Sequence, residues 1–148
     1  GVYQYVVEPA IHEFASLAFE DVCREFVRDK QKKNELPFRY AKMGRWMGKT
    51  TVRDEKASNG LRTAETEIDL LGISRDAKEY LVGECKFKGA PFSYSEYLDT
   101  LAKLSPLKEK ATFYYALFSE NGFDEKIIAD AANATVQLYS LKQIVNAF

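Results

Sequence analysis

The chain has 148 residues, 46% of them hydrophobic and 29% charged, which suffices for one hydrophobic core and is too short for two ordinary domains. Its net charge of −1 excludes a domain that binds nucleic acid through bulk positive charge alone. The sequence has neither an apolar run of roughly 18 residues nor a signal peptide. We therefore expect a protein that neither spans a membrane nor is secreted.

The two cysteines, Cys23 and Cys85, lie in apolar segments and have no paired spacing. This pattern indicates reduced thiols in a cytoplasmic protein and excludes a disulfide or zinc scaffold. The sequence begins at Gly1 without an initiator methionine, which predicts a piece of a longer chain. We interpret residues 1–10 as a linker or cloning scar and residues 11–148 as one domain.

The first half of the chain predicts a helix and then extended segments. Apolar residues recur every three or four positions from Ile11 to about Lys30, which is typical of an amphipathic helix. A weakly patterned strand is expected at 38–47. Residues 48–64 are polar and aperiodic, so they predict a long loop or a hairpin excursion.

The second half predicts a hairpin followed by alternating helices and strands. Residues 65–73 and 80–88 alternate with period two across a polar turn at 74–78, as paired strands do. A helix at 93–107, a central strand at 111–119, a helix at 124–133, a strand at 136–139 and a short final helix follow. This order predicts a layered α/β domain whose later strands are joined by parallel crossovers.

Acidic residues concentrate on the predicted hairpin. Glu65, Glu67, Asp69 and Leu71 share one strand face, and Glu84 and Lys86 share a face of the next strand, about 6.6 Å apart along the backbone. Pairing of the strands would bring Asp69 opposite Glu84. Facing carboxylates repel unless a cation lies between them, and oxygen ligands from separate strands suit Mg²⁺.

The alternative is a solvated ladder of cross-strand salt bridges. The residues around Glu84 argue against it, because Leu81, Val82, Cys85 and Phe87 are typical of a buried strand. Charges persist in such a strand only with a partner or a metal.

The segments Glu67-Ile68-Asp69-Leu70 and Gly83-Glu84-Cys85-Lys86 resemble the PD-(D/E)XK nuclease superfamily, and the order of elements resembles that fold over nearly the whole chain. Together with Phe19-Glu20 and Gly44-Arg45-Trp46, the chain more narrowly resembles the C-terminal nuclease-like domain of archaeal-type P-loop ATPases. In that group the domain follows an ATPase module and a winged helix, which this chain lacks. No proline precedes Asp69, a common departure from the pattern.

The resemblance implies a three-layer, restriction-endonuclease-like fold with a central mixed sheet of four to five strands flanked by helices. It implies Mg²⁺ or Mn²⁺ held by Asp69, Glu84 and the Cys85 carbonyl, with Lys86 beside the attacking water. A helical glutamate joins this set in many members, and the matching position is Glu20, although Glu20 could instead pair with Arg24 one turn later. Glu67 would support the site. Because acids surround Lys86, we expect it to orient water and stabilise the phosphate rather than act as a base, unless bound metal makes it a better one.

One local basic cluster is a candidate nucleic-acid contact. Arg45, Lys49, Arg53 and Arg62 lie near Trp46 in the sequence, a combination that grips phosphates and stacks on a base. The alternative is a solvated loop beside the acidic hairpin. No internal repeat or second motif competes with the acidic hairpin as the candidate site.

The sequence thus predicts a metal-dependent phosphodiesterase acting on DNA, within a larger ATPase chain whose N-terminal ATPase and winged-helix domains are its partners. An alternative from another class is a catalytically silent nuclease-fold domain that serves as an interaction or regulatory module. A third is a structural domain with a surface salt-bridge ladder. The intact set of two acids and a lysine favours catalysis, whereas the near-neutral charge favours a silent role.

Overall fold

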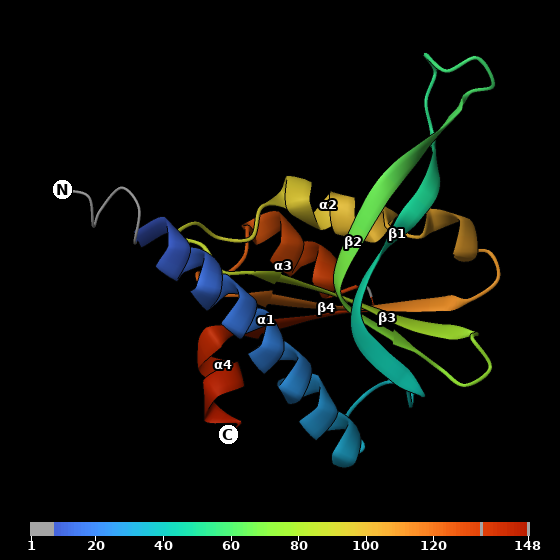
Figure 1. The fold of residues 1–148 in the computed structure, drawn as a ribbon. Coiled ribbons are helices and arrows are strands. Elements are labelled where there is room, and N and C mark those ends of the chain that lie inside the picture. Colours follow the sequence, from blue (N-terminus) through green and yellow to red (C-terminus); the bar gives the residue numbers. More distant parts are fainter. Residues whose placement is uncertain (1–7, 134, 148) are drawn as a thin grey trace.

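The computed structural model describes residues 8–133 and 135–147 and contains a single five-stranded sheet with strand order β1-β2-β3-β4-β5 (Figure 1). The strands are β1 (Lys42–Arg53), β2 (Leu61–Ile73), β3 (Glu79–Lys86), β4 (Thr112–Ser119) and β5 (Val136–Ser140). The helices are α1 (Glu8–Lys32), α2 (Tyr94–Ala102), α3 (Glu125–Ala131) and α4 (Leu141–Asn146), with a short 3₁₀ helix, η2 (Ser105–Leu107). Within these residues, no helix combines the length and the apolar character needed to cross a membrane.

The sheet is mixed, as the sequence predicted. β1 pairs antiparallel with β2, and β2 pairs antiparallel with β3. β3, β4 and β5 run parallel, because α2 and α3 provide the crossovers that parallel neighbours require. The α/β class, the element order and the mixed sheet flanked by helices are therefore confirmed.

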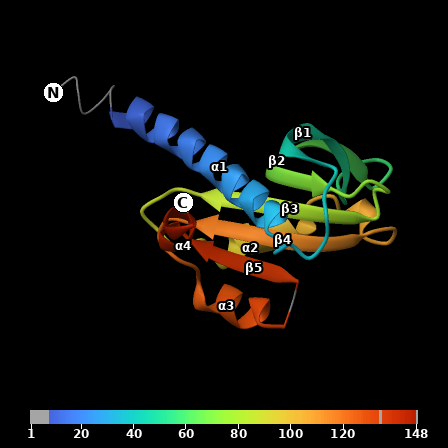
Figure 2. The same ribbon diagram turned by 90° about the horizontal axis from the view of Figure 1, so that it is seen from below.

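Helices cover both faces of the sheet and create two separate cores (Figure 2). On one face, Phe19, Cys23 and Phe26 of α1 and Ile144 of α4 pack on Leu70 and Phe118. On the other, Tyr97 of α2 and Ile127 of α3 pack on Val82 and Leu117. β3 and β4 are covered on both faces, which explains their nearly continuous apolar character.

Of the long loop or hairpin excursion expected at 48–64, the structure shows the hairpin. β1 continues to Arg53 and pairs with β2 out to Arg53↔Leu61, and this distal part of the hairpin extends away from the rest of the domain (Figure 1). The expectation of a strand confined to 38–47 was thus wrong in both bounds. The reason is physical: the side chains described there are exposed or only partly buried, so no apolar period marks a strand that cross-strand pairing maintains.

The expected helix at 93–107 is interrupted. α2 begins with a capping box between Ser93 and Glu96 and ends at Ala102, and Lys103 forms its C-cap. Leu104 adopts a left-handed conformation, with φ 58°, before the short turn of η2. Pro106 lacks the N–H group that a continuous α-helix would need at this point, whereas the first turn of η2 accommodates it.

A bulge in β2 corrects the predicted strand face. The β1–β2 register passes from Gly44↔Leu71 to Trp46↔Ile68, so β2 has one residue more than β1 over this step. As a result Ile68 and Leu71 share one core while Leu70 lies in the other. Strict alternation of Glu65, Glu67, Asp69 and Leu71 on a single face was therefore wrong, because a bulge breaks the period of two.

Candidate functional site

The predicted site residues gather in a pocket of about 460 Å³ where β2, β3, α1 and the end of α2 meet. Glu20, Asp69, Glu84, Cys85 and Lys86 all line it. Its wall also includes Lys103, which sequence reasoning missed. The structure thus brings the predicted acids and the predicted lysine into one solvent-open pocket.

The backbone around Asp69 is fixed from two sides. The N–H of Cys85 donates to Asp69 Oδ2 at 2.9 Å, and Arg24 of α1 donates to the Asp69 carbonyl at 2.8 Å. The β2–β3 ladder runs from Ile73↔Tyr80 to Leu70↔Gly83, and Asp69 and Glu84, the next residues on the two strands, are in side-chain contact. Arg24 therefore anchors α1 to the bulge rather than being reserved for Glu20.

Glu20, Asp69 and Glu84, here called the acid cluster, share hydrogen bonds through their side chains. Burial, followed by the hydrogen bond and negative charge of Asp69, raises the pKa of Glu84 to about 7. The same causes raise the pKa of Glu20 to about 7. Although burial opposes it, hydrogen bonds with both glutamates and with Cys85 lower the pKa of Asp69. Nearby cations offset the rise for the two glutamates only in part: Arg45 and Arg24 lower the pKa of Glu20, and Lys103 lowers the pKa of Glu84, yet both pKa values stay raised.

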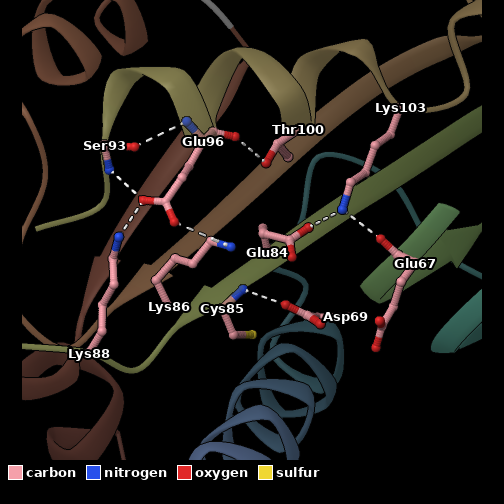
Figure 3. Close-up of polar contacts among 10 residues, drawn as sticks. All are labelled: Glu67, Asp69, Glu84, Cys85, Lys86, Lys88, Ser93, Glu96, Thr100 and Lys103. Atoms are coloured by element: carbon pink, nitrogen blue, oxygen red, sulfur yellow. Dashed lines mark hydrogen bonds and ion pairs between the residues drawn. The ribbon is translucent and has the colours of Figure 1, made fainter.

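Lys86 lines the pocket, but its ammonium engages an acid that sequence reasoning missed. Lys86 Nζ lies 3.5 Å from Glu96 Oε2, and Lys88 Nζ lies 2.6 Å from Glu96 Oε1. We call Lys86, Lys88 and Glu96 the ion cluster (Figure 3). Although burial opposes it, the hydrogen bonds from Lys88 and Ser93 lower the pKa of Glu96 to about 2. Lys86 was expected among Asp69, Glu84 and Glu67, whereas its ion-pair partner belongs to α2.

Lys103 is the lysine that contacts the acid cluster directly. Its ammonium donates to Glu84 Oε2 at 2.7 Å and to the Glu67 carbonyl at 2.5 Å (Figure 3). Glu96 and Lys103 are seven residues apart, which is close to two helical turns. This spacing predicts that Glu96 and Lys103 lie on the same face of the helix. It does not predict which strand residues they contact.

Glu67 contributes differently from the expected support of the acids. Its side chain is exposed and pairs with Arg45 of β1, and its backbone carbonyl accepts from Lys103. Arg45 is therefore neutralised by an acid at the rim of the pocket.

The remaining basic residues of the predicted nucleic-acid contact lie along the β1–β2 hairpin. Lys49 is exposed, and Arg62 pairs with Asp54 at 3.4 Å. Trp46 is partly buried against the core, and Gly48 leaves room for its ring, since a Cβ there would lie 2.5 Å from it. Arg53 ends β1, and its side chain lies outside the described part of the structure.

The oxygen atoms that line the pocket are of the chemical type that binds a hard divalent cation. Three carboxylates and a strand carbonyl are oxygen ligands of the type that Mg²⁺ and Mn²⁺ accept, and carboxylates bind such a cation in their deprotonated form. In their present positions, no three Asp, Glu, His or Cys side chains of the described residues are disposed around a common ion position. The residues therefore fit such a cation by their chemistry, while in this structure Glu84 contacts Asp69 and the Lys103 ammonium.

A larger cavity of about 630 Å³ lies between the end of α1 and strands β4 and β5. Its walls are largely aromatic and aliphatic, and Glu35 is its acidic residue, paired with Lys30 at 3.2 Å. A paired acid in an apolar groove offers no set of groups for acid–base or metal chemistry, so size alone does not make this cavity the candidate site.

Comparisons with known proteins give a family and two similarities. The model of the family DUF234, described as archaeal and bacterial proteins of unknown function, matches residues 2–99. An uncharacterized protein of Methanocaldococcus jannaschii is 32% identical over 77 residues, which cover 52% of this chain and 14% of that protein. The crystal structure of AF1548, a protein of unknown function, gives a TM-score of 0.47 at 14% identity, covering 85% of this chain and 65% of that one. A likeness at that level supports no statement about function.

Proposed function

Since the chain belongs to DUF234, a family of archaeal and bacterial proteins of unknown function, we propose an activity from its own residues: hydrolysis of DNA phosphodiester bonds with Mg²⁺ or Mn²⁺. The observation that carries the proposal is the acid cluster. Three carboxyl groups from α1, β2 and β3 meet in one open pocket whose wall also contains two lysines. Folding places like charges together at a cost, and a cation-binding role explains why that cost is tolerated.

The residues would divide the work as follows. Asp69, Glu84 and the Cys85 carbonyl would hold the cation, with Glu20 as a further carboxylate ligand. A bound cation activates water, neutralises charge on the phosphate and stabilises the leaving oxygen. Lys86, held by Glu96, would orient water and stabilise phosphate charge. Cys85 positions Asp69 through its N–H, and Arg24 prevents the bulge from relaxing.

The wider context is part of the same proposal. DNA as substrate is supported by the exposed Lys49 on the hairpin that borders the pocket. A longer parent chain is supported by length, since the chain spans 14% of the M. jannaschii relative, and ATPase and winged-helix partner domains within it are what the family resemblance implies. Mg²⁺-dependent endonuclease chemistry in the cytoplasm is the role that these features together favour.

One observation favours the silent alternative. The Lys103 ammonium already neutralises Glu84 at 2.7 Å, and Lys86 is engaged by Glu96. A domain so balanced would serve its parent chain as an interaction or regulatory module. The two proposals differ in whether a divalent cation binds.

Calorimetric titration of Mg²⁺ and Mn²⁺ into the chain tests the proposal. The wild type should bind, and Asp69→Asn should weaken binding by at least about a hundredfold, because removing a direct ligand costs more than removing its supports. Glu79→Gln is the matched control: it removes a carboxylate from the opposite end of β3 and should bind as the wild type does. Absence of binding at millimolar cation would leave the silent alternative.

Hydrolysis itself is tested by nicking of supercoiled plasmid. Chelator should abolish nicking by the wild type, and Lys86→Met should slow it by about a hundredfold or more, the usual contribution of one positioned electrostatic group. Equal nicking by both proteins would identify a contaminating nuclease and contradict the assignment.

A further inference from the structure

We propose that Lys103, the C-cap residue of α2, is a counter-ion of the acid cluster. Its ammonium competes with a divalent cation for Glu84 and so sets the affinity of the pocket for that cation. This inference rests on the proposed function, because it concerns how the same pocket is regulated. Lys103 belongs to neither strand of the acidic hairpin and was not among the predicted site residues.

The contacts of Lys103 place it where a cation would have to bind. Its ammonium bonds Glu84 Oε2 at 2.7 Å and the Glu67 carbonyl at 2.5 Å, so one group spans β3 and β2 across the pocket. The two partners are mostly removed from solvent, with side-chain exposures of 21% for Lys103 and 10% for Glu84. A partly dehydrated pair of this kind interacts more strongly than a pair on the open surface.

The backbone holds Lys103 in this position. Lys103 is the C-cap of α2, and its N–H bonds the Thr100 carbonyl. The next residue, Leu104, is left-handed and buried in the core beneath α2. Such a conformation is costly for leucine and is kept only where packing enforces it. The chain therefore reverses directly after Lys103, and the lysine side chain is left at the pocket wall.

The competition follows from charge and geometry. Lys103 acts on two members of the acid cluster, since it pairs with Glu84 and its charge also acts on Asp69. A divalent cation bound to these carboxylates would be repelled by the ammonium and would take over its oxygen on Glu84. A phosphate group entering the pocket would offer Lys103 a new partner. The Lys103 ammonium thus occupies Glu84 until a divalent cation binds the carboxylates and a phosphate group binds the ammonium.

Removal of the charge at position 103 should strengthen cation binding, whereas loss of a purely structural lysine would weaken it. In Lys103→Gln the side chain keeps a polar N–H donor but carries no charge. We expect the dissociation constant for Mn²⁺, measured by calorimetry, to fall roughly tenfold, as loss of one nearby positive charge implies. Lys103→Arg should bind as the wild type does. A purely structural Lys103 would give weaker binding in Lys103→Gln.

Lys108→Met is the matched control for loss of positive charge on the same segment. Its ammonium bonds the Leu101 carbonyl and lies over the Tyr115 ring, away from the acids, so its Mn²⁺ affinity should stay at the wild-type value. If Lys108→Met and Lys103→Gln gained Mn²⁺ affinity equally, the effect would come from net charge and the inference would be overturned.

A measurement on the wild type avoids any folding defect of a variant. The Lys103 ammonium resonance, followed by ¹⁵N NMR during a Mg²⁺ titration, should move as its contact with Glu84 is lost, and an unchanged resonance in the saturated protein overturns the inference. If the wild type binds and Lys103→Gln binds equally or more weakly, the inference fails while the proposed function stands. If neither binds, the metal site itself is refuted and the inference falls with it.

Discussion

Two charged clusters lie next to each other along the end of β3, and the pKa values of their glutamates shift in opposite directions. In the acid cluster, the pKa values of Glu20 and Glu84 rise to about 7. In the ion cluster, the pKa of Glu96 falls to about 2. Burial contributes to the difference, because the Glu84 side chain is 10% exposed whereas the Glu96 side chain is 26% exposed. The charged neighbours also differ: Glu96 meets two ammonium groups, whereas Glu20 meets Asp69, and Glu84 meets Asp69 as well as Lys103.

The comparison shows which cluster supports the fold and which one costs stability. A glutamate with a lowered pKa stabilises the folded state when it is charged, and a glutamate with a raised pKa destabilises it. The ion cluster thus joins α2 to β3, while the acid cluster is maintained by the packing around it. Unfavourable groups kept in an open pocket are typical of a binding or catalytic site.

Gly83→Ala gives the largest expected effect on stability, because it disturbs the backbone that brings the acids together. A Cβ on Gly83 would lie 2.9 Å from Leu70 Cβ, so β2 and β3 would have to move apart beside Asp69 and Glu84. We expect a loss of about 3 kcal/mol in the free energy of unfolding, measured with urea.

Gly72→Ala is its matched control in the same ladder. There the added Cβ would lie 3.4 Å from Leu81 Cβ, and the expected loss is about 1 kcal/mol or less. Similar losses in the two variants would mean that close strand approach does not hold the acid cluster together.

Glu84→Gln gives the next effect, and its sign depends on pH. The pKa of Glu84 in the folded protein, about 7, lies above its ordinary value of 4.5. Its contribution to stability is therefore complete below pH 4.5 and is lost as pH rises through 7. Glutamine does not titrate, so between pH 4.5 and pH 8 the metal-free variant should gain about 2 kcal/mol relative to the wild type.

Urea unfolding of both proteins at pH 4.5 and pH 8 measures this gain. Added Mg²⁺ should reverse the order at pH 8, because the wild type then gains binding energy that the variant lacks. A variant that is less stable than the wild type at pH 8 without metal would show that Lys103 fully balances Glu84.

Much of this arrangement was predictable from sequence. Period-two alternation on both sides of the polar turn at 74–78 predicted the β2–β3 hairpin, and Asp69 and Glu84, which follow the last pair of that ladder, are in side-chain contact as expected. The match of Glu20 to a helical glutamate rested on family resemblance, and α1 does bring it to Asp69. Local periodicity and short-range pairing, which depend on neighbouring residues, are the features that a sequence encodes most directly.

The unpredicted features depend on contacts between distant segments. Apolar residues at 68, 70 and 71 fit a regular strand as well as a bulged one, so pairing with β1 and the bond from Arg24 decide the bulge. Glu96 and Lys103 reach β3 because α2 docks with Tyr97 in the core. The tertiary packing of α2, rather than any pattern within residues 93–107, selects Lys86 and Glu84 as their partners.

Glu96→Gln should give the smallest of these effects, with the opposite dependence on pH. The pKa of Glu96 in the folded protein, about 2, lies below its ordinary value of 4.5, so its contribution is present above pH 4.5 and is lost as pH falls through 2. Because the carboxylate is partly solvated, we expect about 1 kcal/mol at pH 7. Urea unfolding at pH 7 and pH 2.5 should show this difference shrinking at low pH.

Glu96→Gln should also slow plasmid nicking while leaving cation affinity close to that of the wild type, because Glu96 holds Lys86 and touches none of the acids. A parallel loss of cation affinity would mean that the two clusters act as one unit. In that case the ion cluster would not be a separate support of the fold. Glu96 of α2 would then belong to the cation site together with the acid cluster.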